Sequence, residues 1–170
     1  FAESDLESGV VAYEGQDYVL KDNIETFLVL GLDKYEGTDS QNNGNQADFL
    51  MLFVFDDNTQ QCTAIQINRD TMANVNRLDV GGNKIDTTVE QIALAYNYIY
   101  ADSAKKSSRN VADSVEDLLM GIPVQHYITL TMDSVAVMND LVGGVEVTVL
   151  DDFTGIDDTL VEGETVTLKG

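Results

Sequence analysis

Several residue types are nearly absent from the 170-residue sequence, and each absence excludes a class of site. The single cysteine, Cys62, cannot form an intrachain disulfide, and its apolar surroundings predict a buried thiol. The single histidine, His126, alternates with apolar neighbours, so neither a Ser-His-Asp triad nor a zinc site has independent support. We interpret His126 as a structural residue. With only one proline, the chain has no Pro-rich linker.

Positive charge is also scarce. The sequence has nine lysines and arginines against 30 aspartates and glutamates, which gives a formal net charge of −21. A field of this sign repels nucleic acid and anionic membrane surfaces, so the composition disfavours nucleic acid as a partner. An acidic surface of this kind most often serves solubility, and it says little about a substrate.

Long apolar runs are missing as well. No stretch reaches the roughly 18 consecutive apolar residues of a transmembrane helix, and the N-terminus lacks the basic and apolar regions of a signal peptide. The sequence begins with Phe rather than Met, so we expect a trimmed or mature form whose native protein could still carry an anchor. The apolar residues, 44% of the chain, are sufficient for one globular domain with a core.

Three apolar stretches predict the first strands of a sheet. Residues 25–33 (ETFLVLGLD) and 47–58 (ADFLMLFVFDDN) have the continuous apolar pattern of strands buried on both faces, and 61–70 (QCTAIQINRD) is a third buried strand. The short polar connection between the second and third strands predicts a hairpin. Residues 34–46 are predicted to be a loop, and residues 1–23 an N-terminal arm or an edge segment.

The later part of the sequence alternates between the periods of helices and strands. After a second predicted loop at 71–84, the expected elements are helices at 86–101, 107–121 and 133–144 and strands at 124–132 and 145–150. This alternation predicts an α/β fold, a three-layer α/β/α domain with a central mixed β-sheet over residues 24–170.

Charged residues lie where the predicted strands begin or end. Asp33 ends the first strand and Asp48 begins the second, while Arg69 and Asp70 follow the third. If the first strand is antiparallel to the second, all four residues gather at one edge of the sheet, where ligands of α/β proteins collect. Two carboxylates and an arginine fit a magnesium–phosphate site. The structural alternative is a salt-bridge cluster that pins the loop.

Two other features are weaker candidates. Arg109 lies at the start of a predicted helix, where its charge opposes the macrodipole, so a phosphate or an acidic loop must compensate it. The acidic stretch 151–158 lacks the ligand spacing of an EF-hand calcium loop, and no glycine-rich phosphate-binding motif occurs in the sequence.

The order of these motifs resembles the LytR-CpsA-Psr family of extracytoplasmic cell-wall enzymes. The resemblance extends over about residues 24–170, and its most specific parts are INRDT (67–71) and GIPVQHYITLTMDSVAVMNDLVGGVEVTV (121–149). It implies a three-layer α/β domain that transfers a glycopolymer from a polyprenyl pyrophosphate carrier to peptidoglycan, forming a phosphodiester. It also implies an extracytoplasmic location and a native protein anchored in the cell membrane by an N-terminal helix.

The resemblance assigns roles to the clustered charges. Asp33 and Asp48 look like ligands of Mg²⁺, the expected cofactor, and Arg69 looks like the pyrophosphate-binding arginine, with Asp70 organising the loop beside it. Lys84 and Arg109 are the candidates for basic groups that supplement this site. The expected partners are the polyprenyl pyrophosphate-linked glycopolymer and a peptidoglycan acceptor. An apolar groove between sheet and helices would hold the polyprenyl chain, although a plain core explains the same apolar residues equally well.

The sequence departs from the family pattern around this site. Gln46 stands where the family has an arginine two residues before Asp48, and Gln91 and Ala93 replace a lysine and an asparagine. The basic residue that usually follows the first strand is represented only by Lys34.

A further family element, ALxYVRxR, would follow Gly170. We therefore expect these 170 residues to lack the arginine-containing part of the domain and to be catalytically incomplete. The missing arginines and the substitution at Gln46 favour the alternative function, a non-catalytic module that binds polyprenyl phosphates or cell-wall polymer. A scaffold whose acidic surface has no ligand is the third reading.

Overall fold

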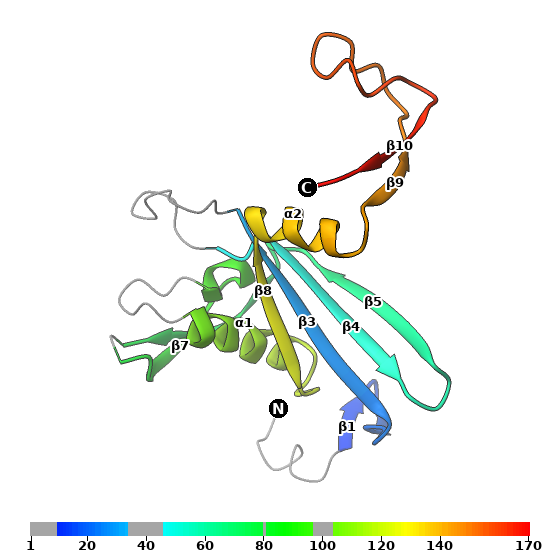
Figure 1. Cartoon of the computed structure of the whole chain (residues 1–170). Coiled ribbons are helices and arrows are strands. Elements are labelled where there is room, and N and C mark those ends of the chain that lie inside the picture. The colour runs from blue at the N-terminus through cyan, green and yellow to red at the C-terminus, as the bar shows by residue number, and fades with distance from the viewer. Residues whose placement is uncertain (1–9, 34–45, 80, 97–103) are drawn as a thin grey trace. The chain divides into compact units, whose positions relative to one another are not determined.

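The computed structural model describes residues 10–33, 46–79, 81–96 and 104–170 (Figure 1). The chain divides into two compact units, Phe1–Leu130 and Thr131–Gly170. The helices and strands in chain order are β1 (Val10–Tyr13), β2 (Gln16–Val19), β3 (Ile24–Leu32), β4 (Phe49–Asp56), β5 (Gln61–Ile67), β6 (Met72–Leu78), β7 (Lys84–Gln91), the 3-10 helix η2 (Ile92–Tyr96), α1 (Ala104–Leu118), β8 (His126–Thr131), α2 (Met132–Leu141), β9 (Val145–Thr148) and β10 (Thr165–Leu168).

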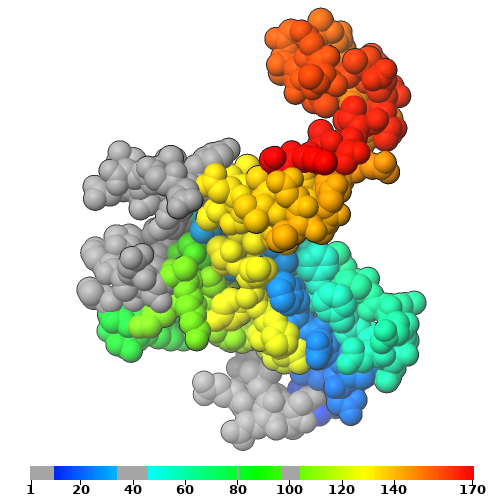
Figure 2. Space-filling model, viewed as in Figure 1, coloured from blue at the N-terminus to red at the C-terminus, as the bar shows by residue number. Residues whose placement is uncertain are grey.

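The first unit is built around a four-stranded sheet with the order β5-β4-β3-β8. The expected hairpin between β4 and β5 and the antiparallel pairing of β3 with β4 are both confirmed. β8 runs parallel to β3, because hydrogen bonds join the starts of the two strands. The hydroxyl of Thr26 in β3 donates to the carbonyl of Pro123 (2.7 Å) and accepts from the N–H of Gln125 (3.0 Å), just before β8. The sheet is therefore mixed. In Figure 2 the blue atoms of β3 lie between those of β8 and β4.

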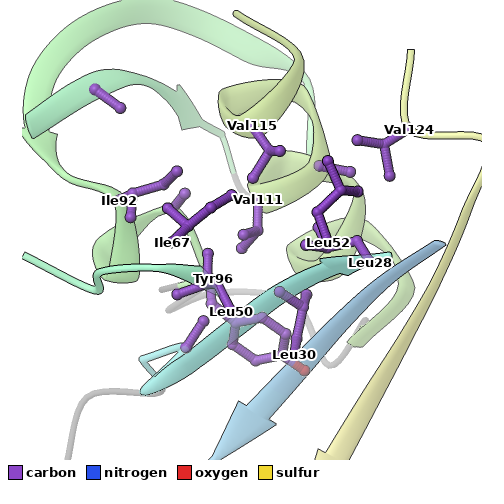
Figure 3. Close-up of a cluster of buried hydrophobic side chains, with 14 of the residues drawn as sticks. Leu28, Leu30, Leu50, Leu52, Ile67, Ile92, Tyr96, Val111, Val115 and Val124 are labelled. Carbon is purple, nitrogen blue, oxygen red and sulfur yellow. The ribbon is translucent and has the colours of Figure 1, made fainter. Parts of the chain in front are cut away.

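The core of this unit lies between one face of the sheet and α1. Leu28 and Leu30 from β3 and Leu50 and Leu52 from β4 are fully buried on that face, since alternate residues of a strand share a face. They point toward Val111 and Val115 of α1 and toward Tyr96 (Figure 3). Burying each of these side chains contributes about 1.5–3 kcal/mol.

The remaining strand surfaces are more exposed than the sequence predicted. On the other face of β3 and β4, most side chains are only partly buried, and a few, such as Phe55, are exposed. β5 is exposed along its length except at Ile67, and Cys62 is exposed, so the predictions of a buried third strand and a buried thiol were wrong. The reason is that β5 is an edge strand, and an apolar pattern does not distinguish an edge strand from a central one.

The loop predicted at 71–84 and most of the helix predicted at 86–101 are instead an antiparallel hairpin, β6–β7, followed by the short helix η2. Val89, Ile92 and Tyr96 fit a helical spacing, but β7 contains the β-branched alternation of Ile85, Thr87 and Val89, which favours a strand. Helical geometry begins only at Ile92. The end of the predicted helix, 97–101, lies outside the described residues.

α1 begins at Ala104, earlier than predicted, and ends as expected near Gly121. Met120 and Gly121 have positive φ values of 59° and 84°, and the N–H of Gly121 bonds the carbonyl of Glu116 (2.7 Å), as in a glycine-capped helix end. Arg109 therefore lies in the second turn of the helix, and its expected position at the helix start was wrong.

The remaining elements are two small hairpins and α2. The N-terminal segment contains the hairpin β1–β2, a sheet of its own, while residues 1–9 and the candidate residue Lys34 lie outside the described residues. In the second unit α2 is followed by the antiparallel pair β9 and β10, and the helix predicted there is confirmed. None of the described helices has the length and apolar character needed to cross a membrane.

Candidate functional site

The β4–β5 hairpin brings Asp48 beside Arg69, as the sequence predicted. Leu50 in β4 pairs with Ile67 in β5, so the residue before β4 and the residues after β5 lie at the same edge of the sheet. Nη1 of Arg69 bonds Oδ1 of Asp48. Nη2 of the same guanidinium donates a 2.5 Å hydrogen bond to Oε1 of Gln46.

Asp33 joins this group from the end of β3. Its backbone N–H donates to Oδ2 of Asp48 (3.3 Å), and the N–H of Asp48 donates to the carbonyl of Gly31 (2.8 Å). Gly31 is required here, because a Cβ at this position would lie 2.9 Å from Cβ of Phe49. Close approach of the two backbones thus places both carboxylate residues at one sheet edge.

The loop after β5 is fixed by its own hydrogen bonds. Oδ1 of Asn68 accepts from the N–H of Asp70 (2.8 Å), a local turn of the kind asparagine favours. The Asp70 carboxylate lies 3.9 Å from Nε of Arg69 and accepts a 3.0 Å hydrogen bond from Gln91. Ala93 donates its N–H to the carbonyl of Arg69 (3.2 Å), which holds the Arg69 backbone against η2.

The group is accessible to a ligand. The side chains of Arg69 and Asp48 are 40% and 29% exposed, and Asp33 is exposed. A guanidinium has five N–H donors, so Arg69 retains donors beyond its bonds to Asp48 and Gln46. Such an arrangement can hold a phosphate oxygen while the carboxylate keeps the guanidinium oriented.

The side chains of this group offer oxygen ligands to a divalent cation. The described residues contain no group of three or more His, Cys, Asp or Glu side chains that could hold a metal ion. Asp33 and Asp48 lie at the same sheet edge, joined by the bond from the Asp33 backbone N–H to Oδ2 of Asp48. Mg²⁺ is usually bound by one or two carboxylates together with substrate phosphates and water. Each carboxylate oxygen can accept more than one bond, so Asp48 keeps acceptor capacity. The residues present therefore fit Mg²⁺ bound together with a phosphate group.

The structure does not bring the other two basic candidates to this group. Nε of Arg109 donates to Asp113 (2.5 Å) and Nη2 donates to Glu116 (2.8 Å), both within α1. Burial alone would lower the pKa of the Arg109 guanidinium, but the hydrogen bond to Glu116 and the charge of Asp113 raise it above its ordinary value. Lys84 lies at the start of β7 and lines a separate polar cavity.

The positions that depart from the family pattern are themselves part of the site. Gln46 bonds Arg69, Gln91 bonds Asp70, and the backbone of Ala93 links Arg69 to Ala47, whose N–H donates to the Ala93 carbonyl (3.1 Å). Reasoning from sequence named these residues only as substitutions. The contacts of Gln91 with Asp70 and of Ala93 with Arg69 were not predicted, because β6 and β7 were not predicted as strands.

Comparison with solved structures shows the same fold. B. subtilis TagV is 22% identical, with a TM-score of 0.59 over 88% of this chain and 53% of TagV. Lin1025 from Listeria innocua is 23% identical (TM-score 0.56; 88% and 50% covered), and gbs0355 from Streptococcus agalactiae is 19% identical (TM-score 0.61; 86% and 48% covered). The chain spans about half the length of these structures. The α/β class with a mixed sheet is thereby confirmed.

Sequence comparison identifies the family. No curated protein matches the chain. The model of the LytR_cpsA_psr family matches residues 4–170, which is nearly the whole chain. The protein therefore belongs to the LytR_cpsA_psr family, whose members are generally associated with the transfer of cell-wall glycopolymers.

Proposed function

We propose that this domain is part of a magnesium-dependent phosphotransferase that moves a glycopolymer from a polyprenyl pyrophosphate carrier to peptidoglycan. The observation that carries the proposal is the half-exposed guanidinium of Arg69, held by Asp48 and Gln46 at the sheet edge where Asp33 also lies. A pyrophosphate concentrates negative charge, and an oriented guanidinium with unused donors is suited to bind it.

In the proposed reaction, a hydroxyl oxygen of the acceptor bonds to the phosphorus that carries the glycopolymer. The bond from that phosphorus to the bridging oxygen breaks, the carrier leaves as its monophosphate, and the hydroxyl proton passes to a carboxylate of the site. Arg69 stabilises the charge that develops on the leaving phosphate, because its position is fixed before the reaction begins. Asp70 and Gln91 keep the Arg69 loop in place.

Mg²⁺ would be held by Asp33 and Asp48. When bound, it would neutralise charge on the pyrophosphate oxygens. The proposal includes an extracytoplasmic location and a membrane anchor for the native protein, since one substrate is a membrane carrier and the other is peptidoglycan.

A second candidate function is a non-catalytic module that binds polyprenyl phosphates or cell-wall polymer. The specific observation in its favour is that neutral Gln46 and Gln91 contact Arg69 and Asp70, at positions where the family pattern has basic residues. With fewer cations at the site, charge developing in a transition state is stabilised less.

The test is transfer of labelled glycopolymer from the polyprenyl carrier to peptidoglycan fragments by the native protein in the presence of Mg²⁺. We expect Asp33→Asn and Arg69→Ala each to reduce transfer about 100-fold or more. Asp57→Asn and Arg77→Ala remove the same charges from exposed positions outside the site and are the matched controls.

Full transfer by both site variants would contradict the proposal. Absence of transfer by the unmutated protein, together with carrier binding that is lost in Arg69→Ala, would instead favour the binding module. Circular dichroism of each variant would show that its fold is intact.

A further inference from the structure

A polar cavity of about 500 Å³ lies between the β6–β7 hairpin and α1. It is formed entirely within the first unit and shares no residue with the Asp48–Arg69 group. In Figure 1 α1 lies alongside the hairpin that contains β7. The cavity is lined by Asn74, Asn76, Lys84, Thr87, Asp113 and Asp117.

Hydrogen bonds fix the walls of this cavity. Nδ2 of Asn74 donates to Oδ2 of Asp117 (2.9 Å), which joins β6 to the end of α1. Across the hairpin, the hydroxyl of Thr87 donates to Oδ1 of Asn76 (3.0 Å). The buried side chain of Asn110 in α1 donates to the carbonyl of Asn76 (3.0 Å). The polar groups of the cavity are therefore positioned before any ligand arrives, which lowers the entropic cost of binding.

Several polar atoms of the lining remain available. The ammonium of Lys84, Oδ1 of Asp117 and Oδ1 of Asn74 make no hydrogen bond to other described residues of the chain. The second carboxylate, Asp113, is paired with Arg109 at 2.5 Å, so its charge is largely compensated. The lining thus offers both donors and acceptors with nearly balanced charge.

This balance excludes simple ions. Lys84 repels a metal cation, whereas Asp117, whose charge is not paired with any described residue, repels an anion. A neutral ligand with many hydroxyl groups satisfies donors and acceptors at the same time, because each hydroxyl can both donate and accept. Next to these groups lies exposed apolar surface. Val89 is 62% exposed and is the cross-strand partner of Asn74, so the two side chains share one face of the hairpin.

We propose that this cavity binds a saccharide unit. Sugars combine hydroxyl edges with faces of C–H groups, and the cavity places carboxylates, amides and an ammonium beside the apolar surface of Val89. Its volume is within the usual range for small-molecule sites. Lys84 is then a saccharide-binding residue rather than a phosphate ligand.

The hairpin also connects the cavity to the Arg69 loop. β6 begins two residues after Asp70, and Gln91 at the end of β7 donates to Asp70. At about 3.4 Å per residue, roughly 14 Å of chain separates Asp70 from Asn74, a distance that an oligosaccharide can span. The assignment of the bound sugar to the transferred polymer or to the acceptor rests on the proposed function, whereas saccharide binding itself does not.

The test is an NMR titration of the 170-residue chain with two neutral probes, chitotetraose and maltotetraose. We expect shifts of the Asn74, Asn76 and Thr87 signals with at least one probe, and an affinity reduced about 10-fold or more in Lys84→Met and Asp117→Ala. Lys105→Met and Asp151→Ala change exposed residues outside the cavity and should bind like the unmutated chain.

The proposal is overturned if neither oligosaccharide shifts these signals at about 10 mM, a concentration that detects even millimolar affinity. Equal affinity in both cavity variants, or shifts produced by Ca²⁺ or tetralysine but by neither sugar, would overturn it as well. Asp33→Asn and Arg69→Ala separate this inference from the proposed function, since they should reduce transfer about 100-fold or more and leave the oligosaccharide shifts unchanged. In the transfer assay, Lys84→Met should raise KM for whichever substrate, donor or acceptor, has its glycan in the cavity.

Discussion

Nη2 of Arg69 donates a 2.5 Å hydrogen bond to Oε1 of Gln46, while Nη1 of the same group bonds Asp48. One guanidinium is therefore held by one acid and one neutral amide. The family pattern has a second arginine at the position of Gln46, so the proposed pyrophosphate site has one arginine fewer in this chain.

Gln46→Arg should tighten the binding of inorganic pyrophosphate in the presence of Mg²⁺. The added guanidinium brings charged donors close to Arg69, and a charged hydrogen bond contributes about 1.5–3 kcal/mol, so we expect about a 10-fold lower Kd. Isothermal titration calorimetry at fixed ionic strength measures the change. Gln61→Arg, at the exposed start of β5, is the matched control. The same gain in both variants would mean that net charge, rather than position, determines binding.

Arg69→Lys should weaken pyrophosphate binding about 10-fold or more although the charge is retained. A lysine ammonium is a compact point charge and cannot reproduce the planar fork that contacts Asp48 and Gln46 together. Arg77→Lys is the control, since Arg77 forms a comparable two-point contact with Asp86 and both side chains are exposed. Unchanged affinity of Arg69→Lys in the same calorimetric assay would show that charge alone is sufficient at this position.

The part of the site that could be predicted from sequence depends on one hairpin. The apolar runs of β4 and β5 and the polar turn between them determine the pairing, and the pairing brings Asp48 to Arg69. Antiparallel pairing of β3 then adds Asp33. Strand period and turn chemistry are local properties, so this much can be read from the order of residues.

The remainder depends on competing local signals and on tertiary contacts. Val89, Ile92 and Tyr96 satisfy a helical spacing, yet residues 84–91 pair as a strand with β6, which is rich in polar residues but has Ala73 and Val75 buried in the core. The contact of Gln91 with Asp70 follows from that unexpected hairpin. In this segment the β-branched alternation and the pairing with β6 outweigh the helical spacing of the apolar residues.

Leu50→Ala should destabilise the first unit by about 2–5 kcal/mol. Leu50 is fully buried between the sheet and α1, so its truncation loses apolar burial and leaves a cavity. Urea denaturation followed by circular dichroism measures the free energy of unfolding. Val19→Ala, at a side chain that is 73% exposed, should change stability by less than about 0.5 kcal/mol. Comparable losses in the two variants would contradict the assignment of the core.

Asp56→Asn should reduce stability in a pH-dependent manner. The Asp56 carboxylate accepts hydrogen bonds from the N–H groups of Thr59 and Asn58 (both 3.0 Å) and pairs with Lys21 (3.3 Å). The hydrogen bond from Thr59, opposed by partial burial and supported by Lys21, lowers the pKa of Asp56 below its ordinary value of 3.8. A carboxyl group with a depressed pKa in the folded state stabilises the fold above its unfolded pKa, and this contribution is lost as pH falls through the folded pKa.

The stability difference between Asp56→Asn and the unmutated chain should therefore be constant from about pH 7 to about pH 5 and should shrink below about pH 4, as the carboxylate of the unmutated chain is protonated. Urea denaturation at each pH measures this difference. Asp57→Asn removes the same charge from the adjacent residue, whose side chain accepts none of these hydrogen bonds, and is the matched control. A difference that stayed the same down to about pH 2 would show that the charge of Asp56 contributes nothing to the stability of the β4–β5 turn, because protonation of the carboxylate would then remove no stabilising interaction.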